Sequence, residues 1–252
     1  LVIGCDQVGA SLIRDLERIG HDISLIEKDP EQLKRLDAFD DYSFGGTALV
    51  PQIHDSLDRL LARARQNKAF TVVNTVYDFR NQRRNPDARW PLGSSDESYR
   101  LIDLLIADLE EAERLSGCTS LDAAMDFFIQ KGVGAVIVTN GSRDVALKIG
   151  SARFEPCTRQ TIPVSQAIVA ELAAHPERKG DTTGCGDNFA GGVIADVARQ
   201  VEAGNARIDL TEAIAWGTVS GGLACFQFGG VLYEEFPGQK RAMMATYLES
   251  AA

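Results

Sequence analysis

The chain has 252 residues and a net charge of −10, with 44% hydrophobic and 25% charged residues. These proportions are ordinary for a globular protein with a substantial core. The acidic balance argues against a nucleic-acid partner, because proteins that bind nucleic acid usually carry a basic face. No apolar run approaches the length of a membrane span and no signal peptide is visible, so we expect no membrane partner.

The cysteines favour a reducing compartment, and the histidines suggest no metal cluster. The five cysteines are odd in number and lack C-x-x-C spacing, which predicts free thiols in the cytoplasm. The three histidines are scattered along the chain. The chain begins on Leu1 rather than Met, so we expect its numbering to start inside a longer gene product. The oligomeric state stays open.

Segments typical of strands and helices alternate along the chain, which predicts an α/β protein. The first forty residues have a β-α-β pattern, with strands at 1–5 and 23–26 and a helix at 8–19. After these we expect a helix start at 30–36, a strand at 42–44, a helix at 53–66, and strands at 69–76 and 101–106. Helices at 109–115 and 121–130 and a strand at 135–139 follow. The last expected elements are a hairpin of 145–149 with 152–154, a helix from 189 and a helix at 210–226.

Residues 79–98 are polar and rich in Arg, Pro, Gly and Ser, which predicts a long loop that is functional or mobile. Arg80, Arg83, Arg84 and Arg89 leave two interpretations open. They bind a phosphorylated sugar, or they form a solvated basic loop.

The most informative stretch is the glycine-rich run 180–192, GDTTGCGDNFAGG, which predicts a loop that leads into a helix. Such a loop points several backbone N–H groups at one anion, and the helix dipole adds positive charge there. Asp187 then lies beside an anion site, where a carboxylate makes sense if it removes a proton from a hydroxyl that attacks phosphorus. The structural alternative is a turn that only lets a helix pack closely on a sheet.

This run closely resembles the D-T-x-G-A-G-D signature of the PfkB (ribokinase-like) carbohydrate kinases. The resemblance implies ATP-dependent, Mg²⁺-assisted phosphorylation of a sugar or nucleoside hydroxyl, and a ribokinase-like three-layer α/β/α fold with a mostly parallel sheet. It assigns catalysis to Asp187 and to the amides of Gly184, Cys185 and Gly186. Cys185 stands where the family usually has Ala. Two interpretations of this cysteine stay open: a small buried residue, or a reactive thiol near a helix N-terminus.

Further places match the family in the order that it requires. Residues 136–141 resemble its T-x-G strand end, so Thr139 and Gly141 are expected at the nucleotide, although an Asn-Gly strand end is often only a turn. Asp108 and Glu111 fall where the family has N-x-x-E beside Mg²⁺, although acidic residues also suit the first turn of a helix.

The resemblance also assigns cofactor binding to the residues around the glycine-rich run and to the helix that follows it. These residues are Asp181, Thr182, Thr183, Gly217 and Gly221. Asp181 is expected to support Mg²⁺ through water. The two glycines belong to a small-residue helix, 213–224, that lies beside adenine in the family or serves plain core packing.

The resemblance covers roughly residues 41–245, so we expect a kinase domain at 41–252 and a Rossmann-like β-α-β segment at 1–40. The segment resembles the NAD-binding domains of potassium-transport regulators of the RCK/KTN type. Glu27 is placed to bond ribose hydroxyls, but Asp6 replaces the middle glycine and opposes a dinucleotide, so NAD binding and a purely structural role stay open. The family's G-G-x-x-x-N sugar segment and lid strands are not found, so we expect its N-terminal sugar-binding portion to be missing.

Two functions therefore remain. The first is a cytoplasmic PfkB-like kinase that acts on a small sugar or nucleoside through Asp187. The alternative is a noncatalytic nucleotide-binding or regulatory protein that has lost its sugar site. The retained base favours the kinase, and the sequence does not identify the acceptor.

Overall fold

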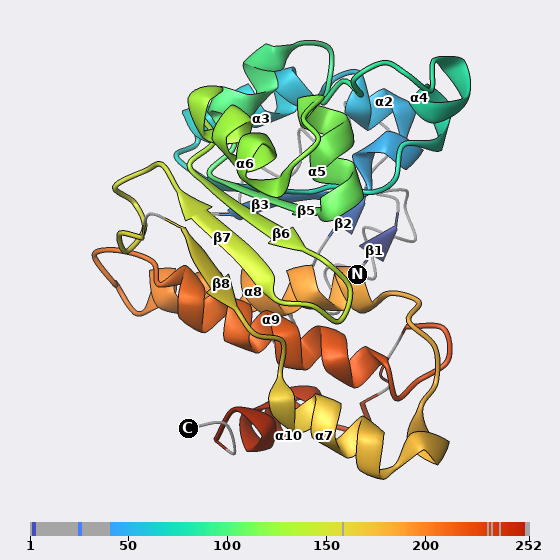
Figure 1. Ribbon diagram of the computed structural model, residues 1–252. Coiled ribbons are helices and arrows are strands. Elements are labelled where there is room, and N and C mark those ends of the chain that lie inside the picture. The colour runs from blue at the N-terminus through green and yellow to red at the C-terminus, as the bar shows by residue number, and fades with distance from the viewer. Residues whose placement is uncertain are drawn as a thin grey trace. The chain divides into compact units, whose positions relative to one another are not determined.

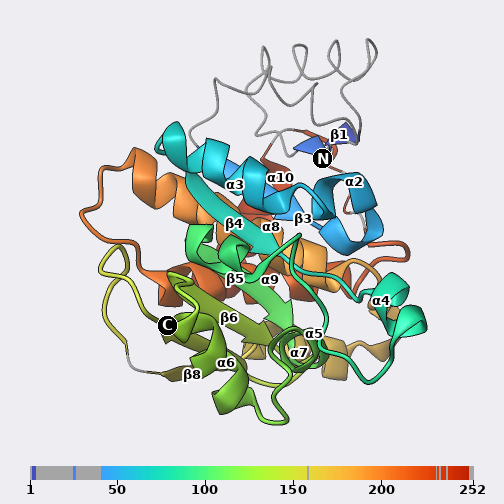
Figure 2. The same ribbon diagram turned by 90° about the horizontal axis from the view of Figure 1, so that it is seen from above.

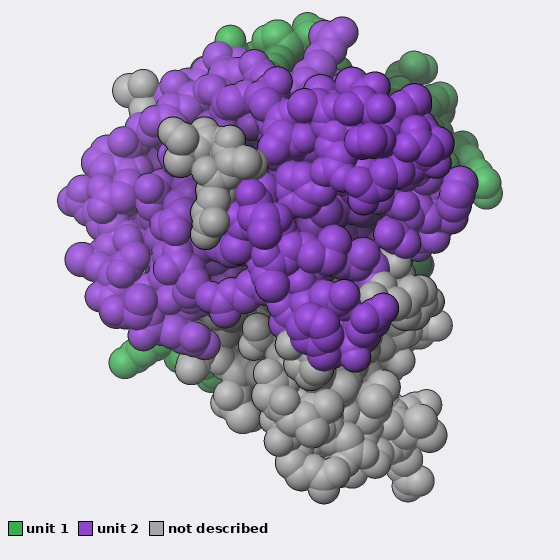
Figure 3. Space-filling model, turned by 90° about the horizontal axis from the view of Figure 1, so that it is seen from below, with its two compact units in different colours: residues 1–136 green, residues 137–252 purple. Residues whose placement is uncertain are grey.

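The computed structural model describes residues 2–3, 25–26, 41–157, 159–230, 232, 234–236 and 238–249. Contacts divide the chain into two compact units, residues 1–136 and 137–252 (Figure 3). The expected boundary near residue 40 stays a prediction, since residues 27–40 lie outside the described ones. None of the described helices is long and apolar enough to cross a membrane.

Six strands form the main sheet in the order β3-β4-β5-β6-β7-β8 (Figure 1). The pairs β3–β4 and β4–β5 are parallel, and β7–β8 is antiparallel. The strands are β3 (Asp41–Gly45), β4 (Phe70–Asn74), β5 (Leu104–Asp108), β6 (Ala135–Thr139), β7 (Val145–Ile149) and β8 (Gln160–Ile162). The described helices of four residues or more are α2 (Pro51–His54), α3 (Leu57–Gln66), α4 (Phe79–Arg84), α5 (Leu109–Ser116), α6 (Leu121–Gln130), α7 (Gln166–Ala174), α8 (Cys185–Glu202), α9 (Leu210–Ala224) and α10 (Gln239–Glu249).

A two-stranded pair lies at the start of the chain. β1 (Val2–Ile3) pairs in parallel with β2 (Leu25–Ile26), as the ends of a β-α-β unit would. The helices expected at 8–19 and 30–36, together with Asp6 and Glu27, lie outside the described residues.

In the first unit, α3 buries one face because Leu57, Leu61 and Ala64 recur at helical spacing. These side chains are fully buried, and α3 lies along β4 (Figure 2). The expected single helix 53–66 is wrong in one respect, because α2 ends at His54 and α3 begins only at Leu57.

The expected loop 79–98 contains regular structure. α4 begins at Phe79 because the side chain of Asp78 accepts a hydrogen bond from the Asn81 amide at 2.9 Å. A 3₁₀ helix, η3, covers Asp96–Leu101. The strand predicted from residue 101 therefore begins only at Leu104.

In the second unit, α8 and α9 lie side by side (Figure 1). Glycines allow this close approach: a Cβ on Gly192 would lie 2.8 Å from the Ser220 Cβ, and one on Gly217 would lie 2.7 Å from the Val193 Cγ2. On another side of α9, buried Ile168 from α7 and Met244 from α10 pack in one cluster. The helices α7 and α10 were not predicted.

The predicted hairpin is wrong in its second strand. β7 pairs with β8, which joins Val145 to Ile162, while Phe154 makes only an isolated bridge to Ile208. β8 has three residues and no fully buried side chain, so it carries no alternating apolar pattern that sequence reasoning detects.

The buried Gln200 joins the end of α8 to the start of α9. Its amide nitrogen donates to Asp196 Oδ2 at 2.7 Å and to the Asp209 carbonyl at 2.9 Å, and its oxygen accepts from the Asp209 amide at 2.7 Å. Gln200→Leu keeps the bulk but leaves these groups unpaired, so we expect the free energy of unfolding to fall by about 2 kcal/mol. Urea denaturation measures this, with the exposed Glu202→Leu as a control expected to shift it by no more than about 0.5 kcal/mol.

Candidate functional site

The glycine-rich run forms a loop that ends in the first turn of α8, and we call residues Gly180–Asp187 the anion loop. Gly184 is the N-cap of α8 in the left-handed conformation, with φ +71°. As a glycine, Gly184 has no side chain of its own to cap this helix end. Because the first amides of a helix have no intrahelical acceptor, the loop presents backbone donors where the dipole favours an anion.

The anion loop is braced along its length by the segment that follows α9. The Gly180 amide donates to the Cys225 carbonyl at 2.8 Å, and the Asp181 amide donates to the Gln227 carbonyl at 3.0 Å. A Cβ on Gly180 would overlap the Gln227 carbonyl, and one on Gly230 would overlap the Thr183 carbonyl. The two segments therefore approach closely only as glycine permits.

Asp181 shapes the loop with its own side chain. Its carboxylate accepts hydrogen bonds from the Thr183 amide at 3.0 Å and from the Gly229 amide at 3.4 Å. Thr182 and Thr183 are both exposed. Asp181 thus shapes the anion loop and joins it to the segment that follows α9.

The three amides expected to bind the anion are not equivalent. The Cys185 amide donates to the Thr182 carbonyl at 3.2 Å, inside the loop itself. Gly186 is exposed, and a Cβ there would meet nothing within 4 Å. Gly186 therefore borders open space at the start of the helix, as an anion-binding residue must.

Asp187 is the third residue of α8 and is exposed. Among the described residues, none donates a hydrogen bond to its carboxylate or pairs with it as a cation. A carboxylate in this position is open to a ligand that reaches the helix N-terminus.

Cys185 is partly buried, and its Sγ lies 3.4 Å from the Sγ of Cys225. Burial and the hydrogen bond with Cys225 raise the pKa of Cys185 to about 12. A thiol with so high a pKa holds its proton at neutral pH, which favours the small, partly buried residue over the reactive nucleophile.

The glycines assigned to the adenine lie against α8. A Cβ on Gly221 would be 2.9 Å from the Cys185 carbonyl oxygen, and one on Gly217 would be 3.0 Å from the Phe189 carbonyl oxygen. These contacts support the packing alternative, and a role beside adenine stays a prediction. Thr139 ends β6, and Gly141 follows in a turn at φ +58°, with nothing within 4 Å of a Cβ placed there.

In the first unit, Asp108 and Glu111 form a capping box at the start of α5. Asp108 Oδ1 accepts from the Glu111 amide at 2.7 Å, and Glu111 Oε2 accepts from the Asp108 amide at 3.2 Å and from Thr75 Oγ1 at 2.5 Å. Asp108 and Glu111 therefore do serve the start of a helix, which is the alternative interpretation given for them above. Thr75 was not singled out from the sequence, although it is a hydroxyl that directly follows the buried strand β4.

Magnesium is compatible with these oxygen donors. Within the described part of the chain, no three His, Cys, Asp or Glu side chains are grouped to hold a metal. Mg²⁺ retains several waters and often uses only one or two carboxylates together with substrate phosphates. The buried Glu111 and the exposed Asp108 are of the right chemical kind for such outer contacts.

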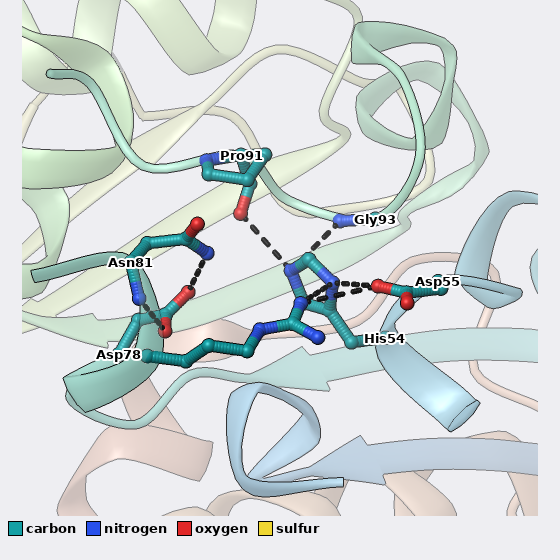
Figure 4. Close-up of polar contacts among 7 residues, drawn as sticks. His54, Asp55, Asp78, Asn81, Pro91 and Gly93 are labelled. Atoms are coloured by element: carbon teal, nitrogen blue, oxygen red, sulfur yellow. Dashed lines mark hydrogen bonds and ion pairs between the residues drawn. The ribbon is translucent and has the colours of Figure 1, made fainter. Parts of the chain in front are cut away.

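Arg80 makes its hydrogen bonds within the first unit, with His54 and Asp55, which Figure 4 labels. Its guanidinium donates to Asp55 Oδ1 at 3.1 Å and lies 3.2 Å from Nδ1 of the buried His54, whose Nε2 lies 3.1 Å from the Pro91 carbonyl. Hydrogen bonds with His54 and Arg80 lower the pKa of Asp55. Arg89 pairs with Asp96 at 2.6 Å. Two of the four loop arginines therefore have structural partners, and the other two, at the end of α4, are exposed.

Comparison with known proteins supplies the family. The family model described as pfkB family carbohydrate kinase matches residues 20–235. Among solved structures, a putative ribokinase II from E. coli is 17% identical with a TM-score of 0.64, covering 99% of this chain and 82% of that one. Aminoimidazole riboside kinase from Salmonella enterica is 17% identical with a TM-score of 0.64, covering 98% and 84%.

A third similar structure is adenosine kinase from Schistosoma mansoni, at 14% identity and a TM-score of 0.61, covering 92% of this chain and 74% of that one. These likenesses show a ribokinase-like α/β fold, as the glycine-rich run predicts. Because the family match extends over most of the sequence, the chain belongs to the pfkB family of carbohydrate kinases.

Proposed function

We propose that this chain transfers the γ-phosphoryl group of ATP to a hydroxyl of a sugar or nucleoside, with Asp187 as the general base. The observation that carries the proposal is an exposed carboxylate, without a protein partner among the described residues, in the first turn of a helix that presents backbone donors. An anion site with a base beside it suits an attack on phosphorus better than simple phosphate storage.

The similar structures support the cofactor and the class of acceptor. The putative ribokinase II of E. coli has been solved in complex with ATP and Mg²⁺. The Salmonella kinase was solved with aminoimidazole riboside and an ATP analogue, and the Schistosoma kinase with adenosine and AMP. A nucleotide donor and a ribose-containing acceptor are therefore the first ligands to test.

In this reaction the Asp187 carboxylate accepts the proton of the acceptor hydroxyl as the hydroxyl oxygen bonds to the γ-phosphorus, and the bond from that phosphorus to the β–γ bridging oxygen breaks to release ADP. The amides of Gly184 and Gly186 hold the charge on the transferring group, while that of Cys185, which already donates to the Thr182 carbonyl, contributes less. Gly186 has the most open position of the three, so we expect it to contribute most. Thr139 and Gly141 would line the nucleotide side.

When bound, Mg²⁺ would neutralise charge on the phosphates. Glu111 and Asp108 of the first unit would hold it through water, since these carboxylates already accept hydrogen bonds from the protein. Their remaining capacity suits ordered waters rather than direct ligation.

An ATP-consumption assay with a panel of sugars and nucleosides tests the proposal. Turnover with one acceptor class supports the kinase and identifies that class. MgATP binding by calorimetry without turnover on any acceptor supports the noncatalytic nucleotide-binding alternative instead.

We expect Glu111→Gln to raise the Mg²⁺ concentration needed for half-maximal turnover by roughly tenfold, the size of effect typical of outer contacts to a metal. The amide keeps much of the side chain's shape and its contact with Thr75, but it loses the charge. Glu110→Gln is the matched control, because Glu110 is the exposed neighbour in the same helix turn. Equal Mg²⁺ dependence in the two variants would limit Glu111 to capping α5.

A further inference from the structure

Asn188, the residue after the proposed base, spans two carbonyls of the site. Its Nδ2 donates to the Gly184 carbonyl at 2.8 Å and to the Gly230 carbonyl at 2.7 Å. One side-chain amide thus uses both of its hydrogens to join the N-cap of α8 to the segment that braces the anion loop.

Lys240 of α10 determines which way this amide points. Its Nζ donates to Asn188 Oδ1 at 2.6 Å. An ammonium group has donors and no acceptor, so the oxygen of Asn188 must face Lys240 and the NH₂ group must face the two carbonyls. Lys240 is partly buried, and this burial lowers the pKa of its ammonium group.

The two carbonyl contacts fix the direction of a backbone donor. The Gly184 carbonyl also accepts from the Asn188 amide at 2.9 Å, so two donors of one residue hold it. The peptide group is planar, and therefore a fixed Gly184 carbonyl fixes the N–H of Cys185 as well. Gly184 itself is left-handed at φ +71°, a conformation that needs support from its surroundings.

We propose that Asn188 and Lys240 form a positioning pair that holds the anion loop in its working geometry for phosphoryl transfer. The inference rests on the proposed function, and it makes α10 part of the support of the site. The pair is not expected to touch the reacting atoms. It acts through Gly184 and Gly230, whose carbonyls it holds in place.

The test compares steady-state kinetics of Asn188→Leu, Lys240→Met, Lys240→Arg and the double variant Asn188→Leu/Lys240→Met with the wild type. We expect kcat to fall by roughly 100-fold for Asn188→Leu, as misplacement of a catalytic group does, and by about tenfold for Lys240→Met. The KM of the acceptor should change little. The double variant should be no worse than Asn188→Leu alone, because both residues act through one contact.

Two comparisons separate positioning from a merely structural role. Lys240→Arg keeps a cationic donor and should recover most of the activity lost in Lys240→Met. Arg241→Met removes an exposed positive charge from the same helix and should keep the wild-type kcat. A Lys240→Met variant that melts at a lower temperature but keeps the wild-type kcat would overturn the proposal.

Hydrogen exchange gives a readout that needs no turnover. Peptides that cover residues 180–190 should exchange faster in Lys240→Met than in Arg241→Met, since the Asn188 amide is bonded to the Gly184 carbonyl. If the wild type phosphorylates no acceptor, the proposed function fails. The exchange comparison still tests whether Asn188 and Lys240 hold the anion loop. Equal exchange in the two variants would overturn the pair itself.

Discussion

Asn in place of Asp187 is expected to remove phosphoryl transfer while the protein remains folded and still binds MgATP. An amide cannot accept the hydroxyl proton, and the loss of a general base lowers turnover by about 10²–10⁴-fold. The side chain is exposed in the first turn of α8, so the lost charge–dipole interaction should lower the free energy of unfolding by only about 0.3–1 kcal/mol. ATP consumption, calorimetry with MgATP and thermal melting measure the three quantities separately.

Asp122→Asn is the control for this experiment. Asp122 is also an acidic residue in the first turn of a helix, α6, and it lies in the other unit of the chain. Its replacement should leave turnover at the wild-type level. If Asp187→Asn also turned over at that level, the base would have to be another group, and the exposed carboxylate would serve only the helix dipole.

The sequence predicted those elements whose residues carry a strong local pattern. Residues 135–139 are a run of apolar, mostly β-branched residues, and they form β6 with the predicted bounds. The run around Gly184 predicted a loop leading into a helix, and α8 is that helix, although it begins at Cys185, before the expected start at residue 189. Short-range chemistry decides these features, so they can be recognised without the rest of the fold.

Features that depend on distant contacts were missed. Lys240 meets Asn188 across 52 residues, and no local pattern announces such a pairing. β8 has only three residues and exists because β7 offers it an edge. The polar composition of residues 79–98, rich in Arg, Pro, Gly and Ser, predicted a loop. The N-cap at Asp78, which starts α4, was not recognised from this composition. Tertiary pairing and capping therefore decided what composition could not.

For the glycines of α9, the sequence allowed two interpretations and could not choose between them. A helix rich in small residues fits a flat base beside it and fits close packing on another helix equally well. The structure shows the packing, since Cβ atoms on Gly217 and Gly221 would meet α8. Composition alone cannot tell which neighbour a small residue makes room for.

Gly230→Ala is expected to be the most damaging change to the loop's support. Gly230 has φ +73°, where an alanine is strained by about 1–2 kcal/mol. Its Cβ would also overlap the Thr183 carbonyl, a backbone atom that cannot rotate away as a side chain can. We expect the free energy of unfolding to fall by at least about 3 kcal/mol and kcat to fall by roughly 100-fold as the loop is displaced.

Gly229→Ala separates the two causes, because the neighbouring residue has the same backbone strain without the overlap. Gly229 has φ +85°, and a Cβ there would meet nothing within 4 Å. This variant should therefore lose only about 1–2 kcal/mol of stability and keep most of its turnover. The difference between the two alanines, measured by urea denaturation and by kcat, then reports the close approach of Gly230 to the Thr183–Gly184 backbone. If both variants lost the same stability and turnover, close approach at Gly230 would not hold the anion loop, and the left-handed backbone would account for the requirement for glycine.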